Sequence, residues 1–260
     1  MYLVLHALSL PWDFPESYFD TKLTELEREM VHSILLKRIF SRKPAAYITN
    51  EAWFCGLPFY VDERVLVPRS PIAELINDRF EPWIDASRVA NILDLCTGSG
   101  CIAIACQYAF PEARVSASDL SSDAIEVAKK NRQNHGLVQQ LTLYESDLFE
   151  QIPPQKFDLI VSNPPYVDAE DMDELSDEFK AEPEMGLAAG VDGLEIVDRL
   201  LKQATGYLSD YGLLVVEVGN SQSAIMEKYS ELALSWIEFE HGGGGVFCIT
   251  ADELKQYYGL

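Results

Sequence analysis

The sequence predicts an α/β protein built on a doubly wound, mainly parallel sheet of seven strands with an antiparallel edge. From Val89 onward, short runs of β-branched and apolar residues alternate with stretches of helical spacing. Such alternation is typical of a parallel sheet with helices on both faces. The last two runs, Leu234–Phe239 and Val246–Thr250, are joined by Glu240-His241-Gly242-Gly243-Gly244-Gly245 without a helix between them. These two are therefore expected to form the antiparallel edge.

The length of 260 residues allows one large α/β domain and a small appendage. We expect residues 1–45 to form a helical N-terminal region, residues 46–85 a β-hairpin and a linker helix, and residues 86–260 the α/β domain. Apolar residues with helical spacing predict a helix over Thr21–Phe40, and the uncapped apolar start of the chain suggests that it begins inside a helical element.

Between Tyr47 and Val67, aromatic and β-branched residues alternate around Gly56 and Pro58, which predicts short strands in a hairpin. A helix is expected next, over about Ile72–Trp83. In the α/β domain the remaining predicted strands are Val89–Leu95, Arg114–Ser118, Leu141–Tyr144, Phe157–Val161 and Gly212–Val218. The predicted helices are Gly100–Phe110, Ser121 (as N-cap) to about His135, Asp192–Leu208 and Ser221–Tyr229.

The composition indicates a soluble globular protein, with 48% hydrophobic residues and mean hydropathy near zero. The longest apolar runs are too short to span a membrane, and the first ten residues lack the basic start and cleavage site of a signal peptide. Five cysteines without a CxxC pair indicate reduced thiols and a cytoplasmic protein. The four histidines are scattered without metal-ligand spacing, so no metal site is expected.

The chain is strongly acidic, with 42 carboxylates against 20 Lys and Arg and a net charge of −22. An anionic surface repels nucleic-acid phosphates and attracts basic proteins, although acidity can also serve solubility alone. Nine carboxylates lie between Asp168 and Glu184, opposed only by Lys180. This acidic run either steers a basic protein partner or forms a solvated loop.

A glycine turn follows the first strand of the α/β domain, in Asp94-Leu95-Cys96-Thr97-Gly98-Ser99-Gly100. Asp119 follows the second strand at the distance expected of a carboxylate that accepts from ribose hydroxyls, so a ribose-bearing cofactor is expected. The position of Asp94 and the turn with only two glycines favour S-adenosylmethionine over a nicotinamide dinucleotide. The expected cofactor-binding residues are Asp94, Cys96, Thr97, Gly98, Ser99, Gly100, Asp119, Leu120, Asp147, Leu148 and Asn163.

Asp147 follows the third strand, where its carboxylate could accept from an adenine amine while Leu148 or Phe149 packs on the ring. A turn or helix cap is an equally good interpretation of Asp147.

The strand Phe157–Val161 leads into Asn163-Pro164-Pro165-Tyr166. Here an amide oxygen, a carbonyl with no N–H of its own and an aromatic face are held rigid by prolines, which suits a planar –NH2 group. We expect Asn163, Pro164 and Tyr166 to be catalytic and all four residues to bind substrate, while a proline-rich turn without function is the alternative interpretation.

Taken together, the glycine turn, Asp119, Asp147 and the Asn163–Tyr166 tetrapeptide resemble the class I S-adenosylmethionine-dependent methyltransferases. The chain is most similar to the protein-glutamine methyltransferases, which methylate a glutamine side-chain amide in release factors or in a ribosomal protein. Three stretches favour the branch that acts on the large-subunit ribosomal protein L-three: Asn50–Gly56, Val61–Ile72 and Glu217–Ser221. The release-factor branch usually has Pro-Arg-Pro-Glu-Thr where this chain has Pro68-Arg69-Ser70-Pro71-Ile72.

The resemblance implies a Rossmann-like methyltransferase sheet, S-adenosylmethionine as cofactor and a basic ribosomal protein of the large subunit as partner. It also implies that the Asn163 side-chain oxygen and the Pro164 carbonyl accept from the substrate –NH2 while Tyr166 packs on the amide plane. The family has a longer N-terminal helical domain, so the region 1–45 is expected to be truncated.

Other functions remain open on the sequence alone. A release-factor methyltransferase shares the motifs, and an exocyclic amine of a nucleic-acid base poses the same geometric problem as an amide. A base methyltransferase should present a basic channel, which the charge of this chain disfavours. A dehydrogenase lacks an obvious hydride-transfer acid here. A binding module without activity, using its acidic face to hold a basic protein, is the non-enzymatic alternative.

Overall fold

The computed structural model describes residues 1–11, 13–166, 181–183, 186 and 194–260. Within them, a seven-stranded sheet has the order β5-β4-β3-β6-β7-β9-β8. Its strands are β3 (Asn91–Leu95), β4 (Arg114–Asp119), β5 (Leu141–Glu145), β6 (Phe157–Ser162), β7 (Leu208–Glu217), β8 (Ser235–Trp236) and β9 (Val246–Thr250). Most of the predicted acidic run Asp168–Glu184 lies outside the described residues, although Glu182 lies within them.

The sheet is parallel except at one edge. β3 pairs in parallel with β4 and β6, and the parallel pairing continues to β5 on one side and to β7 on the other. β9 pairs antiparallel with both β7 and β8. The predicted seven-stranded sheet with an antiparallel edge is confirmed. The strand order reverses between β3 and β6, which is where open α/β sheets bind ligands.

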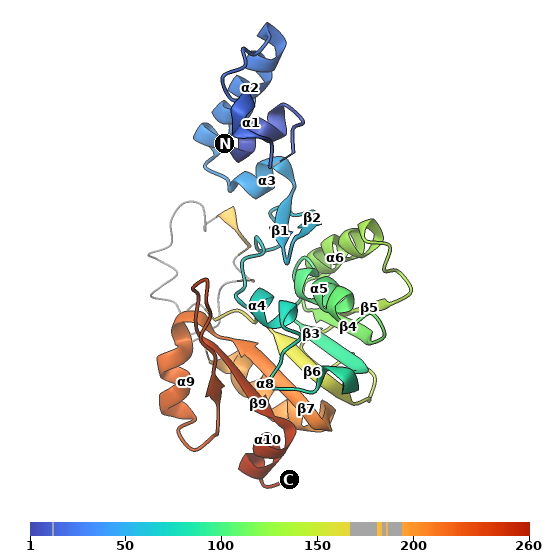
Figure 1. Ribbon diagram of the computed structural model, residues 1–260. Helices are drawn as coiled ribbons and strands as arrows, with labels where there is room; N and C mark the ends of the chain where they lie inside the picture. The colour runs from blue at the N-terminus through green and yellow to red at the C-terminus, as the bar shows by residue number, and fades with distance from the viewer. Residues whose placement is uncertain (12, 167–180, 184–185, 187–193) are drawn as a thin grey trace.

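Both faces of the sheet are buried, and neighbouring residues of one strand enter opposite cores. Leu213 and Val215 of β7 pack in the core that contains α4 (Ile72–Asn77) and α5 (Cys101–Ala109). Leu214 and Val216 pack in the other core, which contains α8 (Glu195–Tyr207), α9 (Gln222–Lys228) and α10 (Ala251–Tyr258). Figure 1 shows these two groups of helices on opposite sides of the strands. Continuous apolar runs are what a doubly covered parallel sheet requires.

The N-terminal region consists of α1 (Tyr2–Ala7), α2 (Glu25–Ser41) and α3 (Ala45–Thr49), which contact one another and stand apart from the sheet (Figure 1). α2 starts later than the predicted Thr21 because Thr24 caps it, with a capping box to Glu27. No described residue of α2 is buried, so its apolar stripe does not serve as a core here.

A short antiparallel hairpin, β1 (Ala52–Phe54) with β2 (Leu57–Phe59), lies between the N-terminal helices and the α/β domain (Figure 1). Its turn residues Cys55 and Gly56 both have positive φ, as a tight hairpin turn requires. The predicted hairpin is confirmed but is shorter than Tyr47–Val67, since Tyr47 belongs to α3.

Several predicted boundaries differ from the structure. The predicted helix Ile72–Trp83 ends at Asn77, because Arg79 and Phe80 take left-handed backbone conformations. β8 has two residues where six were expected, and β7 begins at Leu208 rather than Gly212. α10 was not predicted, although Thr250 caps it through a capping box with Glu253 that is visible in the sequence.

The remaining elements are short or local. α6 (Ser122–Asn134) starts at the predicted cap, where the Ser121 side chain accepts from the Ala124 N–H. Three 3-10 turns are described, at Glu16–Tyr18, Ala86–Arg88 and Gly219–Ser221. Among the described residues, none of the helices combines the length and the apolar character that a membrane crossing needs.

Candidate active site

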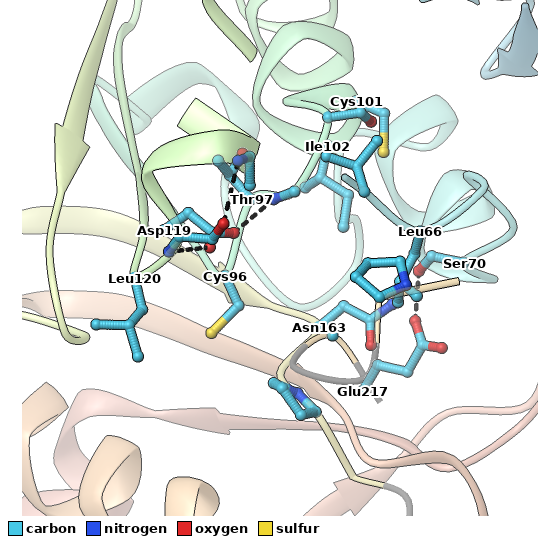
Figure 2. Close-up of a pocket in the computed structure, with 18 of the residues that line it drawn as sticks. Leu66, Ser70, Cys96, Thr97, Cys101, Ile102, Asp119, Leu120, Asn163 and Glu217 are labelled. Atoms are coloured by element: carbon cyan, nitrogen blue, oxygen red, sulfur yellow. Dashed lines mark hydrogen bonds between the residues drawn. The ribbon is translucent and has the colours of Figure 1, made fainter. Parts of the chain in front are cut away.

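A cavity of about 390 Å3 lies where β3, β4, β5, β6 and β7 end. Its volume falls in the range of small-molecule sites. Most of the predicted site residues line it: Cys96, Thr97, Gly98, Ser99, Asp119, Leu120, Asp147, Leu148, Asn163, Pro165 and Tyr166. In Figure 2, Asp119 and Leu120 lie on one side of the cavity and Ser70 with Glu217 on the other, with Cys96 and Asn163 between them.

The glycine turn after β3 forms the floor of the cavity. Cys96 and Gly98 have positive φ values of 58° and 54°, and a Cβ built on Gly98 would meet nothing within 4 Å. A left-handed conformation at a residue other than glycine costs free energy and is found most often at functional sites. Cys96, Thr97, Gly98 and Ser99 all line the cavity, and the absence of a side chain at Gly98 would let a ligand approach the backbone there.

Gly100 has a different position from the other turn residues. It does not line the cavity, and a Cβ on it would lie 3.3 Å from the Ala128 Cβ of α6. Gly100 is the N-cap of α5, where its φ is 81°. Because it has no side chain, α6 can pack closely against the turn. Gly100 therefore supports the conformation of the turn but does not face the cavity in which a ligand would bind.

Asp94 is also absent from the cavity lining, because its side chain is fully buried. Its Oδ2 accepts from the Thr97 hydroxyl at 2.5 Å and from the Ala103 N–H at 3.1 Å. Within the described residues no donor reaches Oδ1. Burial raises the pKa of the Asp94 carboxyl to about 7. The structure does not bring Asp94 into the cavity. Instead, the Asp94 carboxyl group links the glycine turn to the first residues of α5.

Asp119 faces the cavity from the end of β4. Its Oδ2 accepts from the Gly98 N–H at 2.8 Å and its Oδ1 from the Ser121 N–H at 2.9 Å. Burial raises the pKa of this carboxyl, an effect that backbone N–H groups of Ser121, Gly98 and Leu120 oppose. Each oxygen keeps a lone pair for a further donor. Beside it Leu120 is 58% exposed and lines the cavity, so an apolar surface adjoins a held carboxylate.

Asp147 and Leu148 form the wall after β5. The Asp147 Oδ2 makes an ion pair at 2.8 Å with Arg199 of α8, and both side chains are about one-third exposed. Leu148 has a positive φ of 48°, and its carbonyl accepts from the Ser146 hydroxyl at 2.9 Å. Arg199 also lines the cavity. Neither predicted interpretation of Asp147 included this ion pair, because the two residues are far apart in the sequence.

The tetrapeptide Asn163–Tyr166 leaves the sheet directly after β6. Asn163, Pro165 and Tyr166 line the cavity, whereas Pro164 is buried and is not among the lining residues. The Ser162 hydroxyl donates to the Leu95 carbonyl at 3.0 Å, which anchors the end of β6 to β3. The tetrapeptide therefore starts from a fixed point beside the glycine turn.

Tyr166 is held by the last residue of β7 and by the segment that follows this strand. The Ser221 hydroxyl donates to the Tyr166 carbonyl at 2.8 Å, and the Tyr166 hydroxyl donates to the Glu217 Oε1 at 3.4 Å. The ring lies so close to Gly219 that a Cβ there would be 2.4 Å from the Tyr166 Cε2. Burial raises the pKa of the Tyr166 phenol to about 12.

Glu217 is a cavity-lining carboxylate that was not among the predicted site residues, although it begins the stretch Glu217–Ser221 on which the family resemblance partly rests. It is 5% exposed, and its Oε2 accepts from the Ser70 hydroxyl at 2.5 Å. Burial raises its pKa, opposed by the hydrogen bonds from Ser70 and Tyr166. The signal that could have found it is a lone acid at the end of the otherwise apolar strand Leu213–Val218.

Arg69 closes the same end of the cavity. Its Nη1 and Nη2 lie 2.6 and 3.0 Å from the two carboxylate oxygens of Glu182, a bidentate pair, and the Glu182 side chain is almost fully buried. The one described carboxylate of the acidic run thus pairs inside the protein. Two other arginines of the lining, Arg64 and Arg199, are paired with Asp62 and Asp147.

The sheet order, the glycine turn and the carboxylate after β4 define a methyltransferase of the Rossmann-like class. The sequence model of the methyltransferase small domain matches residues 80–190. The structure is similar to the catalytic domain of hMettl16 in complex with an RNA hairpin, with TM-score 0.56 and 15% identity over 74% of each chain. It is also similar to the Thermus thermophilus 16S rRNA N2 G1207 methyltransferase, with TM-score 0.54 and 16% identity over 77% of this chain and 49% of the other. At these identities the likeness shows the fold.

Two sequence relatives are much more similar. The ribosomal protein uL3 glutamine methyltransferase of Francisella tularensis is 45% identical over 99% of this chain and 82% of its own length. The enzyme of the same name from Burkholderia pseudomallei is 46% identical over 100% of this chain and 87% of its own. The chain belongs to the family of ribosomal protein uL3 glutamine methyltransferases, which confirms the predicted family.

Proposed function

We propose that this protein transfers a methyl group from S-adenosylmethionine to the side-chain amide nitrogen of a glutamine in ribosomal protein uL3. Membership of the family carries the choice of substrate. The observation that carries the chemistry is the rigid Asn163–Tyr166 segment, which shares one cavity with Asp119 and the glycine turn.

The residues present fit the cofactor at the end of the cavity formed by β3, β4 and β5. Asp119 would accept from its ribose hydroxyls, since both carboxylate oxygens are fixed by backbone N–H groups and retain a lone pair each. Leu120 and Leu148 would cover its base, and the turn at Gly98 would let it approach the backbone. When bound, S-adenosylmethionine supplies an electrophilic methyl group on a sulfonium.

The residues at the other end of the cavity would position the amide nitrogen of the substrate glutamine, which is a weak nucleophile. An amide nitrogen shares its lone pair with its carbonyl, and a general base cannot remove its proton cheaply near neutral pH. The Asn163 side-chain oxygen would instead accept from an N–H group and hold the nitrogen still; the second predicted acceptor, the Pro164 carbonyl, belongs to a buried residue that does not line the cavity. This hydrogen bonding strengthens as positive charge develops on the nitrogen, so it stabilises the transition state more than the ground state, and the methylated nitrogen then loses one proton to water.

A protein substrate agrees with the charge of the cavity better than a nucleic acid does. Arg64, Arg69 and Arg199 line the cavity, and a carboxylate neutralises each of them. The net charge of −22 would favour a basic ribosomal protein and repel free nucleic acid. The described cysteines are all free thiols, in keeping with reaction in the cytoplasm, where such a substrate is made.

Incubation of the purified protein with methyl-labelled S-adenosylmethionine tests this function. Separate reactions contain uL3, a release factor, and ribosomal RNA, and the labelled residue is located by mass spectrometry. We expect label on one glutamine of uL3. Label on the release factor or on RNA would replace the proposal with one of the two rival activities, and no label in any reaction would contradict it.

A further inference from the structure

We propose that Glu217 is a positioning residue that fixes the Tyr166 hydroxyl as a hydrogen-bond acceptor facing the substrate, so that the site selects a side chain carrying N–H. This inference rests on the proposed function and specifies how an amide is distinguished from a carboxylate. It concerns the end of the cavity formed by β6, β7 and the segment 64–71, which lies across the cavity from Asp119 (Figure 2).

The number of available hydrogens determines which groups around Glu217 donate and which accept hydrogen bonds. The two oxygens of Glu217 contact two hydroxyl groups, Ser70 at 2.5 Å and Tyr166 at 3.4 Å. Burial raises the pKa of Glu217, whereas the hydrogen bonds from these two hydroxyls and the charge of Arg69 favour its ionised form. In that form the carboxylate has no hydrogen to give, so each hydroxyl donates its single hydrogen to it. The Tyr166 oxygen is then left with lone pairs only. Ser70 likewise has none left to donate, and its oxygen already accepts from the Ile72 N–H at 3.2 Å.

The contact from Tyr166 to Glu217 is long, and the position of the ring does not depend on it. The ring is confined by Gly219, where a Cβ would lie 2.4 Å from it, and the Tyr166 backbone is held through its carbonyl by Ser221 at 2.8 Å. What Glu217 determines is therefore the rotation of the hydroxyl about a fixed ring. Glu217 is 5% exposed, so its carboxylate is largely shielded from water that would compete with the hydroxyl for it.

The consequence is a set of acceptors on one side of the substrate position. Asn163 and Tyr166 both line the cavity, so the Tyr166 oxygen would act beside the Asn163 side-chain oxygen, and neither Ser70 nor Tyr166 has a hydrogen left for a ligand. A glutamine side chain brings two N–H hydrogens to such a surface, whereas a glutamate side chain brings none and adds a negative charge near Glu217. Sites that hydrogen-bond a substrate N–H strongly reject analogues that lack it, because their own polar groups are left unpaired.

Steady-state kinetics on uL3 test the inference with Glu217→Gln, Tyr166→Phe and the double variant. The amide introduced by Glu217→Gln has the shape of the native carboxylate but can accept from only one hydroxyl and must donate to the other. We expect each single variant to lower kcat about 10- to 100-fold, as for one hydrogen bond to substrate, with the affinity for S-adenosylmethionine unchanged. The double variant is expected to match Tyr166→Phe, because Glu217 acts through the Tyr166 hydroxyl. Losses that multiply in the double variant, or wild-type kinetics of Glu217→Gln, would overturn the inference.

Two further measurements separate this role from a structural one. Ser70→Ala removes the shorter of the two contacts to Glu217 but leaves Tyr166 in place, so it is expected to lose less activity than Glu217→Gln; an equal loss would indicate a structural bridge and overturn the inference. A uL3 variant carrying glutamate at the methylated position should inhibit Tyr166→Phe at about tenfold lower concentration than wild type. This second measurement does not require Glu217→Gln to fold, and unchanged inhibition would contradict the inference.

The wild-type protein in the same assay keeps the two proposals apart. If it methylates uL3 while the variants behave additively, only the inference about Glu217 fails. If it does not methylate uL3, the proposed function fails and the inference fails with it.

Discussion

Two residues of the cavity are expected to separate the chemical step from cofactor binding. Asn163 lines the cavity at the start of the rigid tetrapeptide, and Asp119 lies at the end of β4 with both oxygens held by backbone donors. Their roles in the proposed reaction are distinct, because one would hold the substrate amide and the other the ribose. Substitution of each should therefore change a different measured quantity.

We predict that Asn163→Ala lowers turnover by about two to three orders of magnitude, as for the loss of one preorganised polar contact, while the affinity for S-adenosylmethionine stays close to wild type. Asp119→Ala is the matched comparison and should weaken cofactor affinity in calorimetry. Near-full methylation by Asn163→Ala would mean that the tetrapeptide is only a structural turn. Unchanged cofactor affinity of Asp119→Ala would contradict the proposed binding of the ribose by Asp119.

Asp94 provides a prediction about stability and pH. Its carboxyl is buried, and its pKa is raised from 3.8 to about 7 in the folded protein. Below pH 3.8 the group is protonated in both states, and its contribution to stability is fully present. As the pH rises toward 7 the unfolded chain releases this proton and the folded protein retains it, so the contribution is lost; above about pH 7 no further change is expected.

Asp94→Asn removes this titration while keeping an acceptor for Thr97 and Ala103. We expect the free energy of unfolding of the wild type, measured with urea, to fall relative to that of Asp94→Asn between about pH 4 and about pH 7. The difference between the two proteins cancels the titration of all other groups. A difference that is constant over this range would contradict the buried, protonated state of Asp94.

At the scale of elements, α6 joins the hairpin segment to the glycine turn through one side chain. Asn131 is fully buried; its Oδ1 accepts from the Tyr60 N–H at 2.8 Å, and its Nδ2 donates to the carbonyls of Tyr60 at 2.9 Å and Ser99 at 2.8 Å. The amide thus satisfies three backbone groups from two segments distant in sequence. One of these segments carries the floor of the cavity.

We predict that Asn131→Ala lowers the free energy of unfolding by about 2–4 kcal/mol, because it leaves these buried backbone groups without partners. Urea denaturation measures the change. Asn134→Ala, an exposed amide on the same helix, is the control and should stay within about 0.5 kcal/mol of wild type. Equal stability of the two variants would show that water replaces the Asn131 amide.

The elements also show what the sequence could and could not predict. β9 matches its predicted bounds, because Val246–Thr250 is a short run of mainly β-branched and aromatic residues, and its first four residues are buried. β8 was overestimated since Leu234–Phe239 has strand composition but only two residues reach the ladder with β9. α10 was missed although Thr250 and Glu253 form a capping box, because the prediction ended with the last strand.

For the candidate site, local motifs predicted lining residues that are contiguous in sequence, and they did not predict lining residues that only the fold brings together. The glycine turn and the Asn163–Tyr166 tetrapeptide were predicted because each is a short segment that directly follows a strand. The pairs Ser70 with Glu217 and Arg69 with Glu182 join residues more than a hundred positions apart, and only the fold brings them together. Asp94 lies within a predicted motif, but the motif does not specify its full burial in β3, between β4 and β6.

At the scale of the whole molecule, charge is the dominant feature. A net charge of −22 on 260 residues creates an attractive field for a basic substrate protein. Such a field raises the rate of encounter more than the strength of the final contacts. Glu182, the described carboxylate of the acidic run, is neutralised by Arg69, so steering would depend on the summed charge and not on this side chain.

We therefore predict that kcat/KM for full-length uL3 falls by about tenfold or more between low and high salt, because salt screens charges over about 10 Å at 0.1 M. A short, uncharged peptide carrying the same glutamine is the control, and its kcat/KM should change little, since it feels no net attraction. Each substrate should keep the same kcat across the titration, which places the effect on encounter and not on chemistry. A flat response for uL3 would mean that the acidity serves solubility, and a parallel fall for both substrates would mean that salt acts on the cavity itself.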